Sequence, residues 1–196
     1  TTEVSIGDNK VNFKRPFKRI SMLDAIKEHT GHDLSSMNES QIRAVCKELG
    51  VEVNETMGKG KLIDEIFGEK CESSYIQPTF ITDYPVEMSP LCKKHRDNPE
   101  LTERFELMVN GKELANAYSE LNDPIDQRER FESQQKLALD GDEEAHPVDE
   151  NFLQAMESGM PPTGGVGIGI DRLVMLLTGN RSIKDVILFP AMKNES

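Results

Sequence analysis

Two segments with strand-like alternation of residue types flank Asn110-Gly111, and together they restrict the fold more than any other part of the sequence. They lie within RFELMVNGKELANAYSEL at residues 104–121. Asn-Gly is the strongest short-range signal for a β-hairpin, because a type I′ turn needs positive φ at both central positions. The flanking strands must then pair antiparallel. Elsewhere, helical and strand patterns mix without βαβ regularity. We therefore expect an α+β fold built around an antiparallel sheet.

A second constraint is the glycine-rich segment GGVGIGIDRLVMLL at residues 164–177. Because side chains alternate along a strand, Gly165, Gly167 and Gly169 leave one face bare, while the apolar residues between them can enter a core. A bare face lets a flat group lie close against the backbone. Arg172 follows just past the strand, where its planar fork can reach a phosphate oxygen.

The glycine spacing excludes two common phosphate-binding patterns. A dinucleotide fingerprint needs GxGxxG, but the residue three positions after Gly167 is Ile170. The Walker A pattern GxxxxGK[ST] does not occur in the sequence either. A purely structural reading stays open, in which the glycines let this strand cross a neighbouring helix closely.

Composition narrows the class of protein. The formal net charge of −12 makes the chain a poor nucleic-acid binder by bulk electrostatics. Its apolar runs are far shorter than the roughly 20 residues of a membrane helix, and no signal-peptide pattern opens the chain. Three widely spaced cysteines form no CxxC pair, which favours reduced thiols. We expect a cytoplasmic protein that makes no membrane contact.

The rest of the chain divides into short elements. Helices are predicted from Ser21, over 38–49 and over 59–69, so residues 21–70 form a small helical insertion. The other expected elements carry their own turn or cap signals. They are a hairpin at 4–13, a strand near 75–82, a helix from Asp123-Pro124 to Gly141, a helix over 149–158 and a closing strand at 186–190.

Several of these segments resemble one enzyme family. GVGIGIDRLVMLL resembles motif 3 of the class II aminoacyl-tRNA synthetases. RFELMVNGKELANAYSELNDPIDQRERFE, PTFITDYPVEMSPL and VILFPAMK are similar to lysyl-tRNA synthetases, and to the eukaryotic cytosolic type best. The resemblance covers nearly the whole chain and is weakest in residues 21–70. It implies a class II antiparallel sheet flanked by helices, with residues 1–196 as the C-terminal part of the catalytic domain.

The resemblance also implies an ATP site. Arg172 would bind the γ-phosphate of ATP as a catalytic residue, and Gly167 and Gly169 would flank the adenine. Glu106 and Glu113 would hold Mg²⁺ against the phosphates. These residue types suit their roles, since hard Mg²⁺ takes carboxylate oxygens and a fixed guanidinium stabilises pyrophosphate as it departs.

A lysine pocket follows from the same resemblance. Asn116, Tyr118 and Glu120 would line it, with Glu120 meeting the side-chain ammonium, since a buried charge needs an opposite partner. The implied reaction joins lysine to AMP and then transfers it to tRNA(Lys). The resemblance implies a homodimer for the full-length enzyme.

Strand geometry sets a condition on this shared site. Counting outward from the Asn110-Gly111 turn, Glu106 and Glu113 fall on one face as diagonal neighbours, able to share a metal. Strict alternation sends the lysine-pocket residues Asn116, Tyr118 and Glu120 to the face opposite Glu113. The two carboxylates and the lysine-pocket residues can line one site only if an extra residue shifts the alternation of the strand. We therefore predict a β-bulge between residues 113 and 116.

The resemblance is incomplete. We find no counterpart of motif 1, of motif 2 or of the anticodon-binding barrel, so we expect the isolated chain to activate lysine poorly or not at all. Two other functions stay open: a related enzyme that lysylates a protein, and a non-catalytic interaction protein on the synthetase fold. The second predicts damage to Glu106, Glu113, Glu120 or Arg172, yet all four are intact.

Overall fold

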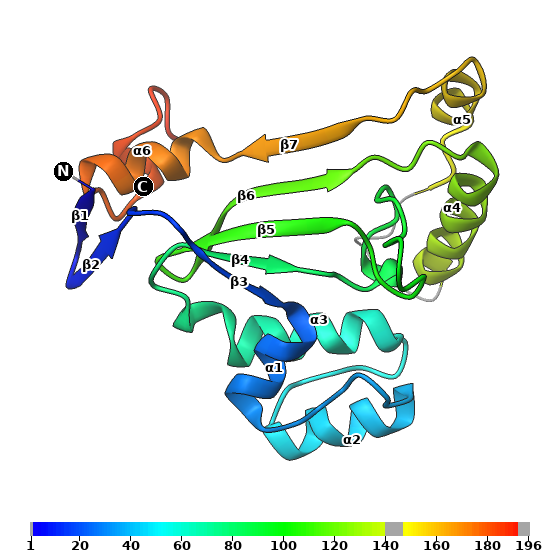
Figure 1. Cartoon of the computed structure of the whole chain (residues 1–196), viewed down its shortest axis with the longest axis horizontal. Helices are drawn as coiled ribbons and strands as arrows, with labels where there is room; N and C mark the ends of the chain where they lie inside the picture. Colours follow the sequence, from blue (N-terminus) through cyan, green and yellow to red (C-terminus); the bar gives the residue numbers. More distant parts are fainter. Residues whose placement is uncertain (1, 140–146, 192–196) are drawn as a thin grey trace, which may run out of the picture.

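A five-stranded sheet forms the centre of the molecule, seen in a computed structural model that describes residues 2–139 and 147–191. Its strand order is β3-β4-β5-β6-β7 (Figure 1). Only β3 and β4 pair in parallel, and the other neighbours are antiparallel. The expected α+β class is thus confirmed. The strands are β3 (Lys18–Ser21), β4 (Thr79–Thr82), β5 (Arg104–Val109), β6 (Lys112–Ser119) and β7 (Gly164–Ile168).

The predicted hairpin joins β5 to β6. Asn110 and Gly111 have φ values of 53° and 70°, the positive pair that the Asn-Gly signal requires. Gly111 is also packed tightly, because a Cβ there would lie 3.0 Å from the Ser73 carbonyl oxygen. A second predicted hairpin, β1 (Glu3–Ile6) with β2 (Asn9–Asn12), forms a separate two-stranded sheet.

Three helices fill the segment that the sequence assigned to a helical insertion. Their ends follow the cap signals: the Ser21 hydroxyl and the Asn38 side chain accept hydrogen bonds from the first turns, and Gly31 and Gly50 end the helices in the left-handed conformation. The placement of this segment as an insertion in a larger catalytic domain stays a prediction. The helices are α1 (Met22–Thr30), α2 (Glu39–Leu49) and α3 (Lys59–Lys70).

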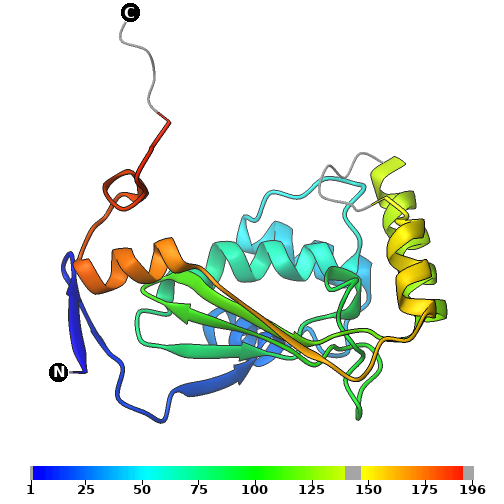
Figure 2. The same ribbon diagram turned by 90° about the horizontal axis from the view of Figure 1, so that it is seen from above.

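The larger core lies between these helices and one side of the sheet. Figure 2 shows α2 and α3 on the same side of the strands. Ile63 and Ile66 of α3 belong to one buried cluster with Ile81 of β4 and Met108 of β5. Burial of such side chains is the main favourable term in folding. α3 therefore covers this face of the sheet over β4 and β5.

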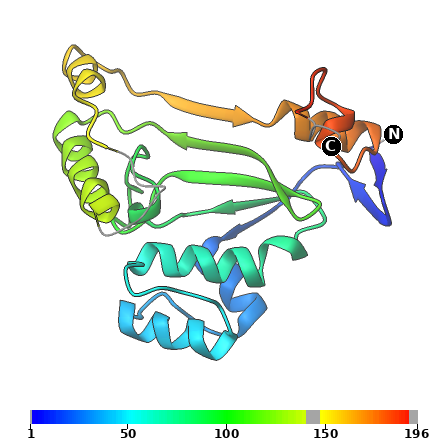
Figure 3. The same cartoon turned by 180° about the vertical axis from the view of Figure 1, so that it is seen from behind.

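Further helices lie at the two ends of the sheet (Figure 3). At one end α4 packs on α5, both near their predicted positions, although the predicted stop at Gly141 lies outside the described residues. At the other end α6 packs with the β1–β2 hairpin around a smaller core. No helix in the described part of the chain is long and apolar enough to cross a membrane. The helices are α4 (Pro124–Leu139), α5 (Glu150–Glu157) and α6 (Ile170–Thr178).

The prediction of a closing strand at residues 186–190 is wrong. A short 3₁₀ turn, η3 (Ile183–Asp185), precedes this segment, and no described strand pairs with it. Leu188 and Phe189 are 88% and 93% exposed. The apolar pattern resembles that of a buried strand, but a strand needs a neighbouring edge to supply its hydrogen bonds, and here it has none.

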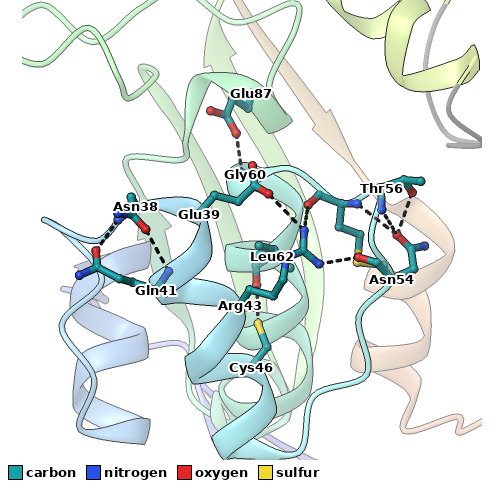
Figure 4. Close-up of polar contacts among 11 residues, drawn as sticks. Asn38, Glu39, Gln41, Arg43, Cys46, Asn54, Thr56, Gly60, Leu62 and Glu87 are labelled. Carbon is teal, nitrogen blue, oxygen red and sulfur yellow. Dashed lines mark hydrogen bonds and ion pairs between the residues drawn. The ribbon is translucent and has the colours of Figure 1, made fainter.

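A carboxylate from the sheet region fixes the start of α3. The N-cap residue Gly58 supplies no side-chain bond, and the Gly60 amide instead donates to Glu87 Oε2 at 2.5 Å (Figure 4). Glu87 lies in the 3₁₀ turn η2 (Val86–Met88), just beyond β4. A negative charge at a helix N-terminus is stabilising. This contact therefore ties the helical segment to the sheet.

Two glycine-to-alanine substitutions in α3 test the contact between Gly60 and Glu87. An added Cβ at Gly60 would lie 2.7 Å from Glu87 Cβ, so Gly60→Ala should lower the free energy of unfolding by about 1–3 kcal/mol. Gly68→Ala in the same helix meets nothing within 4 Å and should raise it by up to about 1 kcal/mol. Urea denaturation measures both. Equal effects of the two substitutions would show that Glu87 does not hold this helix.

A pH-dependent prediction comes from the β5–β6 end of the sheet. Hydrogen bonds from Arg96 (2.7 Å) and the Ser119 hydroxyl (2.9 Å) lower the pKa of Glu103 to about 2. A lowered pKa stabilises the fold above the ordinary Glu value and loses this contribution as pH falls. Glu103→Gln should therefore cost about 1 kcal/mol at pH 7, and the cost should vanish between about pH 4 and pH 2.

Thermal denaturation across this pH range checks the Glu103 prediction. Glu100→Gln is the control, because that nearby side chain is exposed and accepts no hydrogen bond or ion pair in the described part of the chain. A Glu103→Gln cost that stays constant down to pH 2 would contradict the assignment.

Candidate active site

The predicted β-bulge is present in β6. Leu107 pairs with Ala115 and Met108 pairs with Glu113, so Leu114 has no partner in β5. The extra residue lies between 113 and 116, as predicted. It shifts the register so that Glu106 faces Asn116, whereas a regular ladder would place Glu106 opposite Ala115.

The bulge brings two predicted sets of residues onto one face of the sheet. Glu106, Asn116 and Gly167 form one row across β5, β6 and β7. Arg104, Tyr118 and Gly165 form the next row. Residues directly opposite one another in adjacent strands point to the same side. Glu113 joins this face through its pairing with Met108, which lies two residues from Glu106.

A cleft of about 850 Å³ opens beside these rows. Arg104, Glu106 and Glu113 line it from the sheet, and residues of α3 and of the loop before it line the opposite side. The loop is held by Arg43, whose guanidinium donates to the carbonyl oxygens of Asn54 and Met57, both at 2.6 Å (Figure 4). The cleft is therefore walled by two parts of the fold that Glu87 keeps together.

The carboxyl groups of the cleft favour a cation. Burial raises the pKa of Glu106, and the neighbouring Arg104 opposes this shift. Burial also raises the pKa of Asp64 in α3 and of Glu72, and the charge on Glu106 adds to both shifts. A bound cation would relieve this cost of ionisation. Among the described residues no three His, Cys, Asp or Glu side chains form a metal site.

Arg172 lies at the Glu113 end of the same face. It occupies the first turn of α6, is half exposed, and donates from Nη1 to the Glu113 carbonyl at 2.5 Å. Its Nη1 lies 3.9 Å from Glu113 Oε2. The strand ends at Ile168, so Gly169 is the N-cap of α6 and not a member of the strand face. The structure thus brings the predicted phosphate-binding arginine next to a predicted metal ligand.

The bare strand face is open. An added Cβ at Gly167 would meet only the Asn116 carbonyl oxygen, at an ordinary 3.8 Å, so the explanation that the glycines let a helix cross closely is wrong. Gly165 differs, because a Cβ there would collide with the Glu120 carboxylate. Glycine at 165 therefore makes room for Glu120, whereas glycine at 167 leaves space that no described residue fills.

Glu120 lacks a cationic partner. Its carboxylate makes no hydrogen bond or ion pair within residues 2–139 and 147–191, and burial raises its pKa. Burial, and then the charge on Glu120, also raises the pKa of the neighbouring Tyr118. A partly buried carboxylate beside a tyrosine is ready to accept an ammonium group.

Arg104 was missed by sequence reasoning. It donates to Glu106 Oε1 at 2.5 Å and to Asn116 Oδ1 at 3.2 Å, so it touches two of the predicted site residues. The signal was available, since Arg104 lies two residues before Glu106 and must share its face. Asp64 and Glu72 could not be placed near the site from sequence, because only the packing of α3 brings them there.

Comparison with known proteins assigns this chain to a family. The sequence profile described as tRNA synthetases class II (D, K and N) matches residues 1–193. Proteins named lysine–tRNA ligase from Porphyromonas gingivalis and Christiangramia forsetii are 71% and 65% identical over 195 residues. Each match covers 100% of this chain and 34% of the relative, so the chain spans about a third of their length.

These relatives correct one expectation. A similar lysine–tRNA ligase from Azobacteroides pseudotrichonymphae is 65% identical, with 39% of its length covered, and it too is bacterial. The expected closer likeness to eukaryotic cytosolic enzymes is therefore wrong, because these relatives, which are 65–71% identical, are bacterial proteins. The profile match over nearly the whole chain shows that the chain belongs to the class II tRNA synthetases of the aspartate, lysine and asparagine group.

Proposed function

We propose that the chain carries the motif 3 half of a lysine–tRNA ligase, which activates lysine with ATP and transfers it to tRNA(Lys). The observation that supports this most is the single row of Glu106, Asn116 and Gly167 across three strands. This row supports the proposal, because a metal ligand at Glu106, a lysine pocket at Asn116 and an adenine surface at Gly167 would then be neighbours. The names of the similar proteins agree with this function.

The lysine substrate would occupy the Tyr118 end of the face. Glu120 would accept the side-chain ammonium, and the neighbouring Tyr118 would flank it. Asn116, which lies directly opposite Glu106 in the next row, would orient the lysine carboxylate toward the α-phosphorus. Attack there forms lysyl-adenylate and releases pyrophosphate. Positioning carries most of the rate in such a step, because the protein supplies no covalent chemistry.

ATP would lie across the other end of the face. The adenine would rest on the backbone at Gly167, where an added Cβ meets no described side chain within 4 Å, close to the N-cap residue Gly169, which the Arg172 side chain contacts. Arg172 would direct its fork to the γ-phosphate, and its half-exposed position leaves the guanidinium accessible. Its hydrogen bond to the Glu113 carbonyl holds the side chain in place.

Glu106 and Glu113 would hold Mg²⁺. The donor set fits this ion, since Mg²⁺ is commonly bound by one or two carboxylates together with substrate phosphates and waters. The raised pKa of Glu106 fits as well, because a buried carboxylate gains most from a nearby cation. When bound, the ion supplies positive charge that offsets the phosphates.

The whole enzyme would be a cytoplasmic homodimer, of which this chain is the C-terminal part of the catalytic domain. Since the chain spans about a third of its relatives, we propose that it activates lysine poorly or not at all by itself. A non-catalytic protein on this fold would not need to keep the four charged site residues, yet all four are present. They are Glu106, Glu113, Glu120 and Arg172. A protein-lysylating enzyme is less favoured, because the relatives are named as tRNA ligases.

The test uses a hybrid ligase, in which this chain replaces the matching third of the Porphyromonas gingivalis protein. In this hybrid ligase, Gly167→Ala should raise KM for ATP by about tenfold or more, because a methyl group would occupy the adenine surface. Stability should be unchanged, since the methyl meets no protein atom closer than 3.8 Å. ATP–pyrophosphate exchange measures KM.

Gly164→Ala is the matched control, on the same strand but on its other face. Its added Cβ would lie 3.9 Å from the nearest atom, the Tyr118 carbonyl oxygen, so it should leave KM for ATP unchanged. If both substitutions left KM unchanged, ATP would not lie on this strand. If both raised it equally, the effect would come from the strand backbone.

A further inference from the structure

Arg104 is held in a fixed position at the edge of the cleft. Its Nη1 donates to the Ser89 hydroxyl at 2.9 Å and to the Met88 carbonyl at 3.2 Å. Its guanidinium lies 4.4 Å from the centre of the Tyr84 ring, a stacking distance for a cation on an aromatic face. The Arg104 side chain is only 15% exposed, and Tyr84 and Ser89 are each 2% exposed. The guanidinium therefore has little freedom to move.

The remaining donors of Arg104 point to two different site residues. Nη2 donates to Glu106 in β5, and Nε donates to Asn116 in β6. One planar guanidinium therefore contacts both the Glu106 and the Asn116 side chains, which lie opposite each other. A lysine side chain at position 104 could not contact both residues in this way, because an ammonium is a point charge without the fixed fork of a guanidinium.

The Arg104 contact also decides which end of the Asn116 amide faces outward. Arginine has only hydrogen-bond donors, so the Asn116 atom that meets it must be the oxygen. Asn116 Nδ2 then has no hydrogen-bond partner within the described part of the chain. Asn116 is left with its two N–H groups available for an acceptor on the substrate.

We propose that Arg104 is a positioning residue for lysine activation, which holds the Glu106 carboxylate and presents Asn116 as a hydrogen-bond donor to the substrate carboxylate. This inference rests on the proposed function and adds a residue to it. Arg104 itself acts through the two side chains and does not touch the substrate. Without Arg104, Asn116 can rotate its amide, and Glu106 loses the charge-assisted bond that orients it.

A double-mutant cycle in the hybrid ligase separates this role from a structural one. Arg104→Met should lower kcat/KM for lysine by about 100-fold, a loss within the range for misplaced catalytic groups. Asn116→Ala alone should also lower it. If Arg104 acts through Asn116, adding Arg104→Met to Asn116→Ala should cost at least fivefold less than it costs in the parent. Arg104→Lys should recover little of the loss.

The outcomes are distinct. Losses that multiply to within about twofold in the double variant would overturn the inference, because a structural role is additive. Arg96→Met, which removes a surface arginine that pairs with Glu103, should leave kcat/KM unchanged. If Arg104→Met does not fold, Arg104→Lys takes its place in the cycle. An unsubstituted hybrid ligase that folds but shows no lysine-dependent exchange would overturn the proposed function, and this inference with it.

Discussion

One unpaired residue, Leu114, sets the geometry on which the site depends. Without it, alternation would put Glu113 on one side of the sheet and Asn116, Tyr118 and Glu120 on the other. With it, the part of β6 before the bulge and the part after it both direct site residues to one face. Leu114 is itself buried in the smaller core with α6 and the β1–β2 hairpin, so packing holds the bulge in place. A local irregularity in the ladder thus brings all the candidate site residues of β6 onto one face of the sheet.

The helical segment completes this surface as a wall. α3 buries its apolar face on β4 and β5 and leaves its polar face, with Asp64, toward the cleft. Two contacts fix that wall: the Glu87 carboxylate at the start of α3, and the Arg43 guanidinium on the loop before it. The site therefore combines acidic groups from the sheet and from the helices. Burial, with the charge of neighbouring carboxylates, raises the pKa values of Asp64 and Glu106. A bound cation would make it easier for both groups to ionise.

Much of the fold could be predicted from local signals. The Asn110-Gly111 turn and the caps at Ser21 and Asn38 follow from rules that act over a few residues. The bulge was instead predicted from the condition that the carboxylates and the lysine-pocket residues share one face. The segment at 186–190 was predicted wrongly because strand formation depends on a partner edge, which local pattern does not reveal. The lack of a helix over Gly167 likewise depends on how distant elements pack.

The site could be predicted in part. Spacing on the two strands placed Glu106 and Glu113 together, and the bulge condition placed the lysine-pocket residues with them. Arg104 obeys the same alternation as Glu106, but no motif in the sequence gives this arginine a role, so it was not predicted. Asp64 and Glu72 reach the cleft only through tertiary packing, so no sequence rule could find them.

The most direct test is lysine-dependent ATP–pyrophosphate exchange in the hybrid ligase with and without Arg172→Ala. We expect exchange in the parent and a loss of about 100-fold or more in the variant, because the substitution removes a charged donor aimed at a phosphate. Arg128→Ala, which removes a surface arginine paired with Glu150, should leave exchange unchanged. Exchange that survives Arg172→Ala at the parent rate would contradict the claim that these strands and α6 form one activation site.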